Sequence, residues 1–122
     1  MTTTPVFGFG FTTENDTEAA KANTQNENWL LAEAILKRAI IDRDLSVAPG
    51  APTNGDVYLV PPEGASPSVT GEWLGKEDNL AVYYNGWIFM APVAGPTFKL
   101  LDEGIVIEYD TAGSPASWVT VV

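Results

Sequence analysis

The hydrophobic pattern divides the chain into three parts that predict different structures. Residues 1–16 alternate three phenylalanines with glycine, and this period of two is typical of a strand with one aromatic face. Residues 17–45 carry apolar positions at helical spacing. Residues 46–122 show short apolar runs separated by turns rich in proline and glycine. The pattern therefore predicts an α+β chain with an N-terminal arm, a single long helix and a small antiparallel β barrel or sandwich.

The helical segment has several candidate starts and one clear end. Thr24 and Glu27 fit a capping box, in which the two side chains satisfy free backbone N–H groups at a helix start. Earlier starts at Thr13 or Thr17 are also open, because good helix formers follow them. The Pro-Gly pair that begins at Pro49 is expected to stop the helix.

The apolar residues of this helix cover more of its circumference than one small domain buries. At 100° per residue they span about half of the circumference, and a second apolar patch lies on another side. One interpretation is a central helix wrapped by the chain's own sheet. The other is self-association, because four of these positions follow the 3-4-3 spacing of a helix-bundle seam. The residues expected at an interface between copies are Trp29, Ala32, Leu36, Ala39 and Ile40.

The aromatic arm also has two interpretations. It either completes the chain's own sheet or forms a loose tail, since a lone segment of this kind cannot stabilise itself. Alternatively, Phe7, Phe9 and Phe11 dock into a neighbouring subunit by strand addition or pocket insertion. The second interpretation makes residues 1–16 a docking arm.

The β domain is predicted most clearly by residues 80–90, which place Asn85-Gly86 between two apolar runs. This pair favours a two-residue type I′ turn, which sets Tyr84 opposite Trp87. Residues 72–74 have the composition of a short strand. Further strands are expected at residues 56–60, 97–101, 105–109 and 118–122.

Composition excludes several classes of function. The chain has 122 residues and 45% hydrophobic residues, enough for one packed domain. Sixteen acidic residues against six basic ones give a net charge of −10, which disfavours nucleic acid and anionic membranes as partners. The absence of histidine and cysteine removes the commonest general base, thiol nucleophiles and most zinc chemistry. No apolar run is long enough to insert into a membrane, and the N-terminus lacks a basic signal region.

The remaining candidate chemistry is carboxylate and aromatic. Glycoside hydrolysis needs two carboxylates across a cleft, but the acidic residues lie mostly beside turns, so no catalytic residue is predicted. Residues 77–79 and 102–103 offer oxygen ligands without calcium-loop spacing, so neither a metal nor another cofactor is predicted. Five aromatic residues either fill the β core or form a platform on which a sugar stacks: Trp73, Tyr83, Tyr84, Trp87 and Trp118. The residues selected for the platform are Trp73, Tyr84 and Trp87.

The order of several motifs resembles a known family. This family is a domain of unknown function found in tailed bacteriophages and gene transfer agents of alphaproteobacteria, often in tail-fibre or other virion surface proteins. The resemblance covers roughly residues 7–118. The motifs that carry it are residues 25–27, 49–52, 55–60, 71–75 and 80–89, together with Asp42, Asp44, Pro92 and Gly95.

The resemblance implies a virion component on the particle surface, made in the host cytoplasm. Residues 12–23 depart from the family, in which a more basic stretch with a histidine is expected here. The chain ends soon after the last motif, which favours a head decoration or fibre subunit, or a tail adaptor. The expected partners are other copies of the chain, most simply as a trimer, and capsid or tail proteins. The alternative is a glycan- or receptor-binding module that mediates host attachment.

Overall fold

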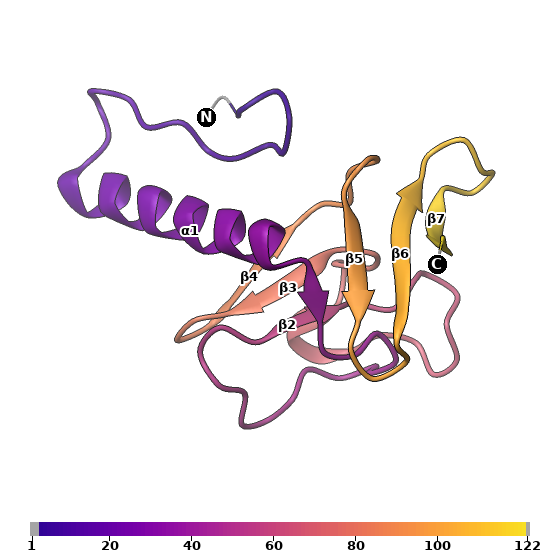
Figure 1. Ribbon diagram of the computed structural model, residues 1–122. Helices are drawn as coiled ribbons and strands as arrows, with labels where there is room; N and C mark the ends of the chain where they lie inside the picture. Colours follow the sequence, from indigo (N-terminus) through magenta and orange to yellow (C-terminus); the bar gives the residue numbers. More distant parts are fainter. Residues whose placement is uncertain (1–2, 122) are drawn as a thin grey trace.

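One long helix precedes two β-sheets in the computed structural model, which describes residues 3–121 (Figure 1). The arrangement confirms the predicted α+β class, with an open sandwich of two sheets rather than a closed barrel. The helix α1 spans Glu18–Lys37. The strands are β1 (Ala39–Ile40), β2 (Val57–Leu59), β3 (Leu80–Tyr83), β4 (Trp87–Met90), β5 (Thr97–Leu100), β6 (Ile105–Asp110) and β7 (Ser117–Thr120).

The helix begins after Thr17, the second of the three starts that its sequence offered, and ends sooner than expected. Thr17 is the N-cap, and its hydroxyl oxygen accepts a hydrogen bond from the amide of Ala20 at 3.1 Å. The capping box at Thr24 was therefore wrong, because that residue lies inside α1. Arg38 ends the helix in the left-handed conformation, with φ of 55°, and its amide donates to the carbonyl of Ala34.

The helix ends at Lys37 rather than at residue 45 because the next residues form a strand. The segment 38–42 lies between β5 and β2 and is hydrogen-bonded on both sides. Four backbone hydrogen bonds join the segment to these strands and the residues beside them. They connect Arg38 O to Lys99 N (2.8 Å), Ile40 O to Leu101 N (2.9 Å), Ile41 N to Val57 O (2.8 Å) and Asp42 O to Leu59 N (3.1 Å). The segment therefore connects the edges of the two sheets.

The two sheets have the strand orders β1-β5-β6-β7 and β2-β3-β4. All neighbouring strands are antiparallel except β1 and β5, which are parallel. Alternate residues of the smaller sheet enter two different cores, so both of its faces are covered. The first core, shared with α1 and the larger sheet, contains Leu31, Ala34, Ile40, Val57, Leu59, Leu80, Val82, Met90, Phe98, Leu100 and Ile107. The second contains Val60, Val69, Trp73 and Ala81.

The hairpin between β3 and β4 forms where expected but in a different register. Tyr83, rather than Tyr84, pairs with Trp87, which leaves a loop of three residues. Asn85 has φ of 53°, a conformation that asparagine tolerates better than most residues. The side chain of Asn54 accepts a hydrogen bond from the amide of Asn85 at 2.9 Å and so holds the loop from outside the hairpin. The predicted two-residue turn was wrong, since residues 84–86 form the loop and the contact with Asn54 comes from a segment that the local sequence does not reveal.

Two other expected strands differ from the structure: one does not form, and the other has different ends. Residues 72–74 do not form a strand; a short 3-10 helix, Gly71–Trp73, buries Trp73 completely. The last strand occupies Ser117–Thr120 rather than residues 118–122, and residue 122 lies outside the described residues.

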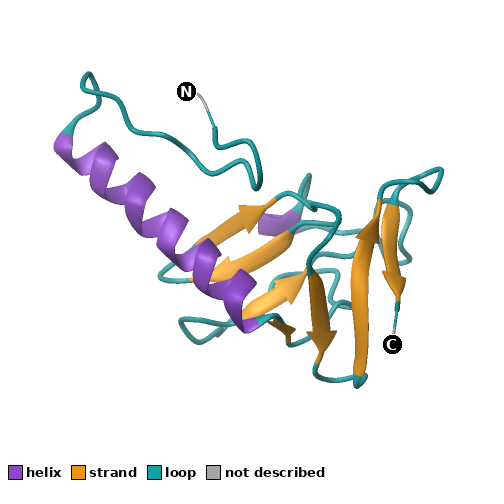
Figure 2. Ribbon diagram, turned by 45° about the horizontal axis from the view of Figure 1, so that its top comes forward, coloured by secondary structure: helices purple, strands orange, loops and turns teal. Residues whose placement is uncertain are grey.

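The N-terminal segment turns back on itself and lies along α1 (Figures 1 and 2). The amide of Thr4 donates to the carbonyl of Phe9 at 2.7 Å, and the amide of Gly8 donates to the carbonyl of Thr4. The side-chain amide of Asn28 donates to the carbonyl of Gly10 at 2.9 Å, which fastens the segment to the helix. Residues 1–2, part of the predicted arm, lie outside the described residues.

Replacing Ile40 tests the role of the segment that joins the sheets. Ile40 is fully buried in the first core, so Ile40→Ala is expected to lower the free energy of unfolding by about 2–5 kcal/mol. Urea denaturation followed by circular dichroism measures this loss. Leu101→Ala, at an exposed position beside the same segment, is the control and should change stability by about 0.5 kcal/mol or less. Equal losses in the two variants would contradict the assigned role of Ile40.

Candidate functional site

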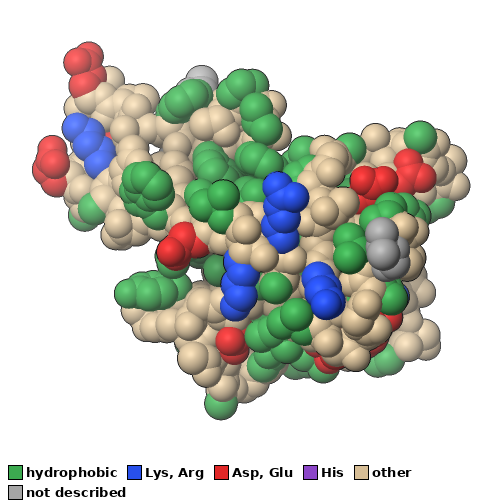
Figure 3. All heavy atoms as spheres, viewed as in Figure 1, with side chains coloured by type: hydrophobic (Ala, Val, Ile, Leu, Met, Phe, Trp, Pro, Cys, Tyr) green, Lys and Arg blue, Asp and Glu red, His purple; other side chains and the backbone are tan. Residues whose placement is uncertain are grey.

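The face of α1 that points away from the core carries two large apolar side chains. Trp29 is 69% exposed and Leu36 is 80% exposed. They are seven residues apart, so they lie two turns apart on the same face of the helix. Leu31 and Ala34 occupy the face that packs on the first core. In Figure 3, hydrophobic side chains gather where the N-terminal segment lies over α1.

Two residues of the expected interface do not belong to this face. Ala39 and Ile40 lie in β1, and Ile40 is completely buried in the chain's own core. A buried side chain of this kind cannot contact a partner, so its place in the seam was wrong. The seam on α1 is reduced to Trp29 and Leu36, with Ala32 half-buried between them.

Two of the three phenylalanines of the predicted docking arm pack against the chain's own core, and the third is exposed to solvent. The rings of Phe7 and Phe9 stack with centroids 5.8 Å apart and pack against the chain's own first core. Phe11 is 47% exposed. The simultaneous docking of all three rings into a neighbour is therefore inconsistent with this arrangement, and Phe11 is the member that stays accessible.

The predicted aromatic platform does not form a flat surface. Trp73 is fully buried, and its ring packs edge-on against that of Trp87 with centroids 5.2 Å apart. Trp87 also packs against Tyr58 and Tyr83, at 5.9 and 5.1 Å. Tyr84 is 51% exposed in the hairpin loop. These contacts favour the core interpretation for the tryptophans, because a buried ring offers no face to a sugar.

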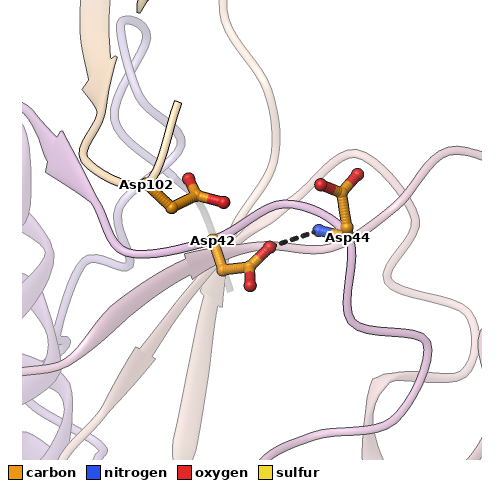
Figure 4. A group of neighbouring side chains, drawn as sticks. All are labelled: Asp42, Asp44 and Asp102. Atoms are coloured by element: carbon orange, nitrogen blue, oxygen red, sulfur yellow. Dashed lines mark hydrogen bonds between the residues drawn. The ribbon is translucent and has the colours of Figure 1, made fainter. Parts of the chain in front are cut away.

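Three aspartates meet beside the segment that joins the sheets (Figure 4). Asp42, Asp44 and Asp102 each place a carboxylate oxygen within 4.8 Å of the others. Oxygen ligands at this spacing suit a hard cation such as Ca²⁺, although two of the three residues are exposed. The sequence singled out residues 102–103 but not their proximity to Asp42 and Asp44, because these residues come from different turns.

The electrostatics of this cluster are set by several neighbouring charges. Burial raises the pKa of Asp44, and the negative charges of Glu103 and Asp42 raise it further. The guanidinium of Arg43 donates two hydrogen bonds of 2.9 Å to the carboxylate of Glu103. Because the positive charge of Arg43 is already paired with Glu103, it offsets the negative charge of Asp44 only in part.

A cavity of about 410 Å³ lies next to the acidic cluster. It is formed by four segments: the residues after β1, β2 with the loop that follows it, Asp78 just before β3, and the start of β7. In Figure 1 the loop after β2 passes below the C-terminal end of β7. The lining residues are Arg43, Asp44, Leu59, Val60, Pro61, Pro62, Ala65, Ser66, Pro67, Asp78, Ser117 and Trp118.

Trp118 is held in a fixed orientation at the wall of this cavity. Its indole N–H donates a hydrogen bond of 2.9 Å to the backbone carbonyl of Asp78. Its ring also packs against Phe98 and Tyr109, with centroids 5.9 and 5.4 Å away. Burial raises the pKa of Asp78, and the nearby charge of Glu77 adds to the effect. The cavity thus combines an immobilised aromatic ring with partly desolvated carboxylates.

The sequence did not reveal this cavity. The sequence includes Trp118 among five aromatic residues that could form a sugar platform, but it gives no sign of the neighbours of Trp118, and it indicates residues 77–79 only as possible cation ligands. The four segments that form the cavity are far apart in the chain, and each is ordinary turn or strand sequence. Only the prolines after β2 signalled a rigid loop at this position.

Comparison with known proteins identifies a family. A family model described as a protein of unknown function (DUF2793) matches residues 25–115. No curated protein matches the chain significantly. The match covers most of α1 and the strands from β1 to β6. Within residues 3–121, no helix combines the length and the apolar character needed to cross a bilayer.

The raised pKa of Asp78 predicts how stability depends on pH. A folded-state pKa above the ordinary value of 3.8 means that the ionised carboxylate destabilises the fold, and this cost disappears below the unfolded-state pKa. Asp78→Asn is therefore expected to raise the melting temperature more at pH 7 than at pH 3. Asparagine also suits the φ of 68° at this position, but that benefit does not vary with pH. Asp16→Asn is the control, and a gain at Asp78 that is equal at both pH values would refute the prediction.

Proposed function

We propose that this chain, which belongs to the DUF2793 family of proteins of unknown function, is a non-enzymatic structural protein on the surface of a bacteriophage particle. It assembles with copies of itself as a head decoration or fibre subunit, or as a tail adaptor or fibre component. The observation that carries the proposal is the exposed apolar face of α1, at Trp29 and Leu36. The resemblance of the ordered motifs to a domain of phage and gene-transfer-agent surface proteins supplies the setting.

Assembly through α1 follows from the cost of leaving this face in water. Isolated exposed apolar residues are common on monomers, but two large ones on one helix face favour a contact. Tryptophan is among the residues that contribute most to protein interfaces. Between them, Ala32 is small enough to let a second helix approach closely. A trimer is the expected assembly by analogy with viral fibres, which is an argument from architecture alone.

Charge supports a role on the outside of a particle. The net charge of −10 keeps an exposed domain soluble and repels anionic surfaces. Residues 46–122 contain nine acidic and two basic residues, a net charge of −7 out of the total of −10, so the β domain is the part suited to face solvent. The absence of histidine and cysteine favours a structural rather than a catalytic role.

A charge placed on the exposed face of α1 tests the assembly. Leu36→Glu and Trp29→Glu are each expected to reduce the oligomer to monomers, because burying an unpaired carboxylate in an apolar contact is unfavourable. Sedimentation equilibrium gives the mass, and circular dichroism confirms the fold. Leu74→Glu, at an exposed apolar position on the β domain, is the matched control and should keep the native mass. Unchanged mass in both helix variants would exclude α1 as the interface.

Phe11 tests the docking role of the N-terminal segment. Phe11→Ala removes the accessible ring and leaves the packed pair Phe7 and Phe9 in place, so the isolated protein should fold normally. Incorporation into particles is expected to fall severalfold, because an aromatic anchor is lost. Quantitative immunoblotting of purified particles measures it, with Val47→Ala as the control at an exposed site on the β domain. Native incorporation of the Phe11 variant would remove the docking role.

A further inference from the structure

The cavity beside β7 has the size and the walls of a small-molecule site. Its volume of about 410 Å³ lies within the range of roughly 300–1,000 Å³ that is typical of such sites. One part of the wall is apolar and rigid, formed by the Trp118 ring and by prolines of the loop after β2. The other part is polar, with carboxylates and the hydroxyls of Ser66 and Ser117. A ligand that fills it needs an apolar face and a polar rim.

The charges of the wall determine which polar groups the ligand carries. Asp44 and Asp78 only accept hydrogen bonds when ionised, so the ligand rim must supply donors. Arg43 is engaged by Glu103 at 2.9 Å and cannot fully offset the two carboxylates. Glu77 adds negative charge near Asp78. An anionic ligand is therefore repelled. A neutral ligand rich in hydroxyl groups supplies donors to both carboxylates, whereas a small cation satisfies the charge but leaves the hydroxyls of Ser66 and Ser117 unused.

We propose that this cavity binds a neutral sugar residue of a polysaccharide. A pyranose has C–H groups on its faces, which suit the electron-rich face of an indole, and hydroxyl donors around its rim. Hydrogen bonds from hydroxyl groups to ionised carboxylates are about twice as strong as bonds between neutral groups. Trp118 supplies the apolar surface, and Asp44 and Asp78 accept from the hydroxyls. The indole N–H of Trp118 donates to the backbone carbonyl of Asp78, so the ring is oriented before the ligand arrives.

This site shares only Trp118 with the aromatic residues that the sequence offers for a sugar platform. Two of the others, Trp73 and Trp87, pack in the second core. The cavity uses Trp118, which belongs to the larger sheet. The proposal is also independent of assembly, because the cavity lining given above includes no residue of α1. A monomeric Leu36→Glu variant is expected to keep sugar binding, so failure of one proposal is distinguishable from failure of the other.

Titration of the full-length, ¹⁵N-labelled protein tests the site. The probes are the methyl glycosides of glucose, galactose and mannose, with glucuronic acid and choline as the anionic and cationic comparisons. At least one neutral glycoside is expected to shift the indole N–H resonance of Trp118 and the amides of Ser66 and Asp78 at millimolar concentration. Glucuronic acid should produce smaller shifts at the same concentration, because both carboxylates repel it.

Variants assign the shifts to the cavity. The double variant Asp44→Asn, Asp78→Asn preserves the shape of both side chains and is expected to weaken binding about tenfold or more, since two charge-assisted bonds become neutral. Asp16→Asn, in the N-terminal segment, is the matched control and should bind as the unmodified chain does. Ala65→Trp fills the loop side of the cavity and should abolish binding if the carboxylate variants do not fold.

Several outcomes would overturn the proposal. The first is the absence of shifts with every neutral glycoside. The second is a set of shifts centred on Tyr84 and Trp87 instead of Trp118. Glucuronic acid binding more tightly than the neutral sugars would refute the argument from charge, and choline binding more tightly would show that the cavity takes a cation instead of a sugar. Binding that survives both the double asparagine variant and Ala65→Trp would place the sugar elsewhere on the chain.

Discussion

The hydrogen bonds of residues 38–42 are the constraint from which the rest of the structure follows. This segment pairs with β5 on one side and with β2 on the other, so it joins the two sheets that would otherwise have separate edges. Its central side chain, Ile40, is fully buried between them. An unpaired backbone group in this position would cost as much as a lost hydrogen bond, so the segment cannot remain helical without opening both sheets. The left-handed Arg38 marks the point at which the chain changes from helix to strand.

The early end of α1 limits the surface that the helix offers to other molecules, because Ala39 and Ile40 belong to β1 instead. The helix packs on the core through Leu31 and Ala34, and its opposite face stays in solvent. Trp29 and Leu36 on that face are what self-association would cover. The same joining segment leads directly into Asp42 and Asp44, where it forms one wall of the cavity that ends at Trp118. The surface for assembly and the proposed sugar site are separate, but both depend on the strand that residues 38–42 form between the two sheets.

Local sequence predicted most of the fold and little of the candidate site. The strands after residue 56 and the helix start at Thr17 were readable, because turn residues and N-caps act over a few positions. The strand around Ile40 was missed because it is two residues long and follows a helix of similar apolar character. The hairpin register depends on Asn54, which is far from the loop it holds. The cavity could not be predicted, since Trp118 and its partners meet only through tertiary packing.

The central claim is that the outward face of α1 is covered by a second copy of the chain. It is tested most directly by adding a soluble paramagnetic agent to the labelled protein and following the indole N–H signal of Trp29 as protein concentration rises. The account predicts that attenuation of this signal decreases as copies associate and cover the ring, while the partly buried Trp118 indole changes little. A Trp29 signal that stays equally attenuated at every concentration, in a protein that sediments as a monomer, would contradict it.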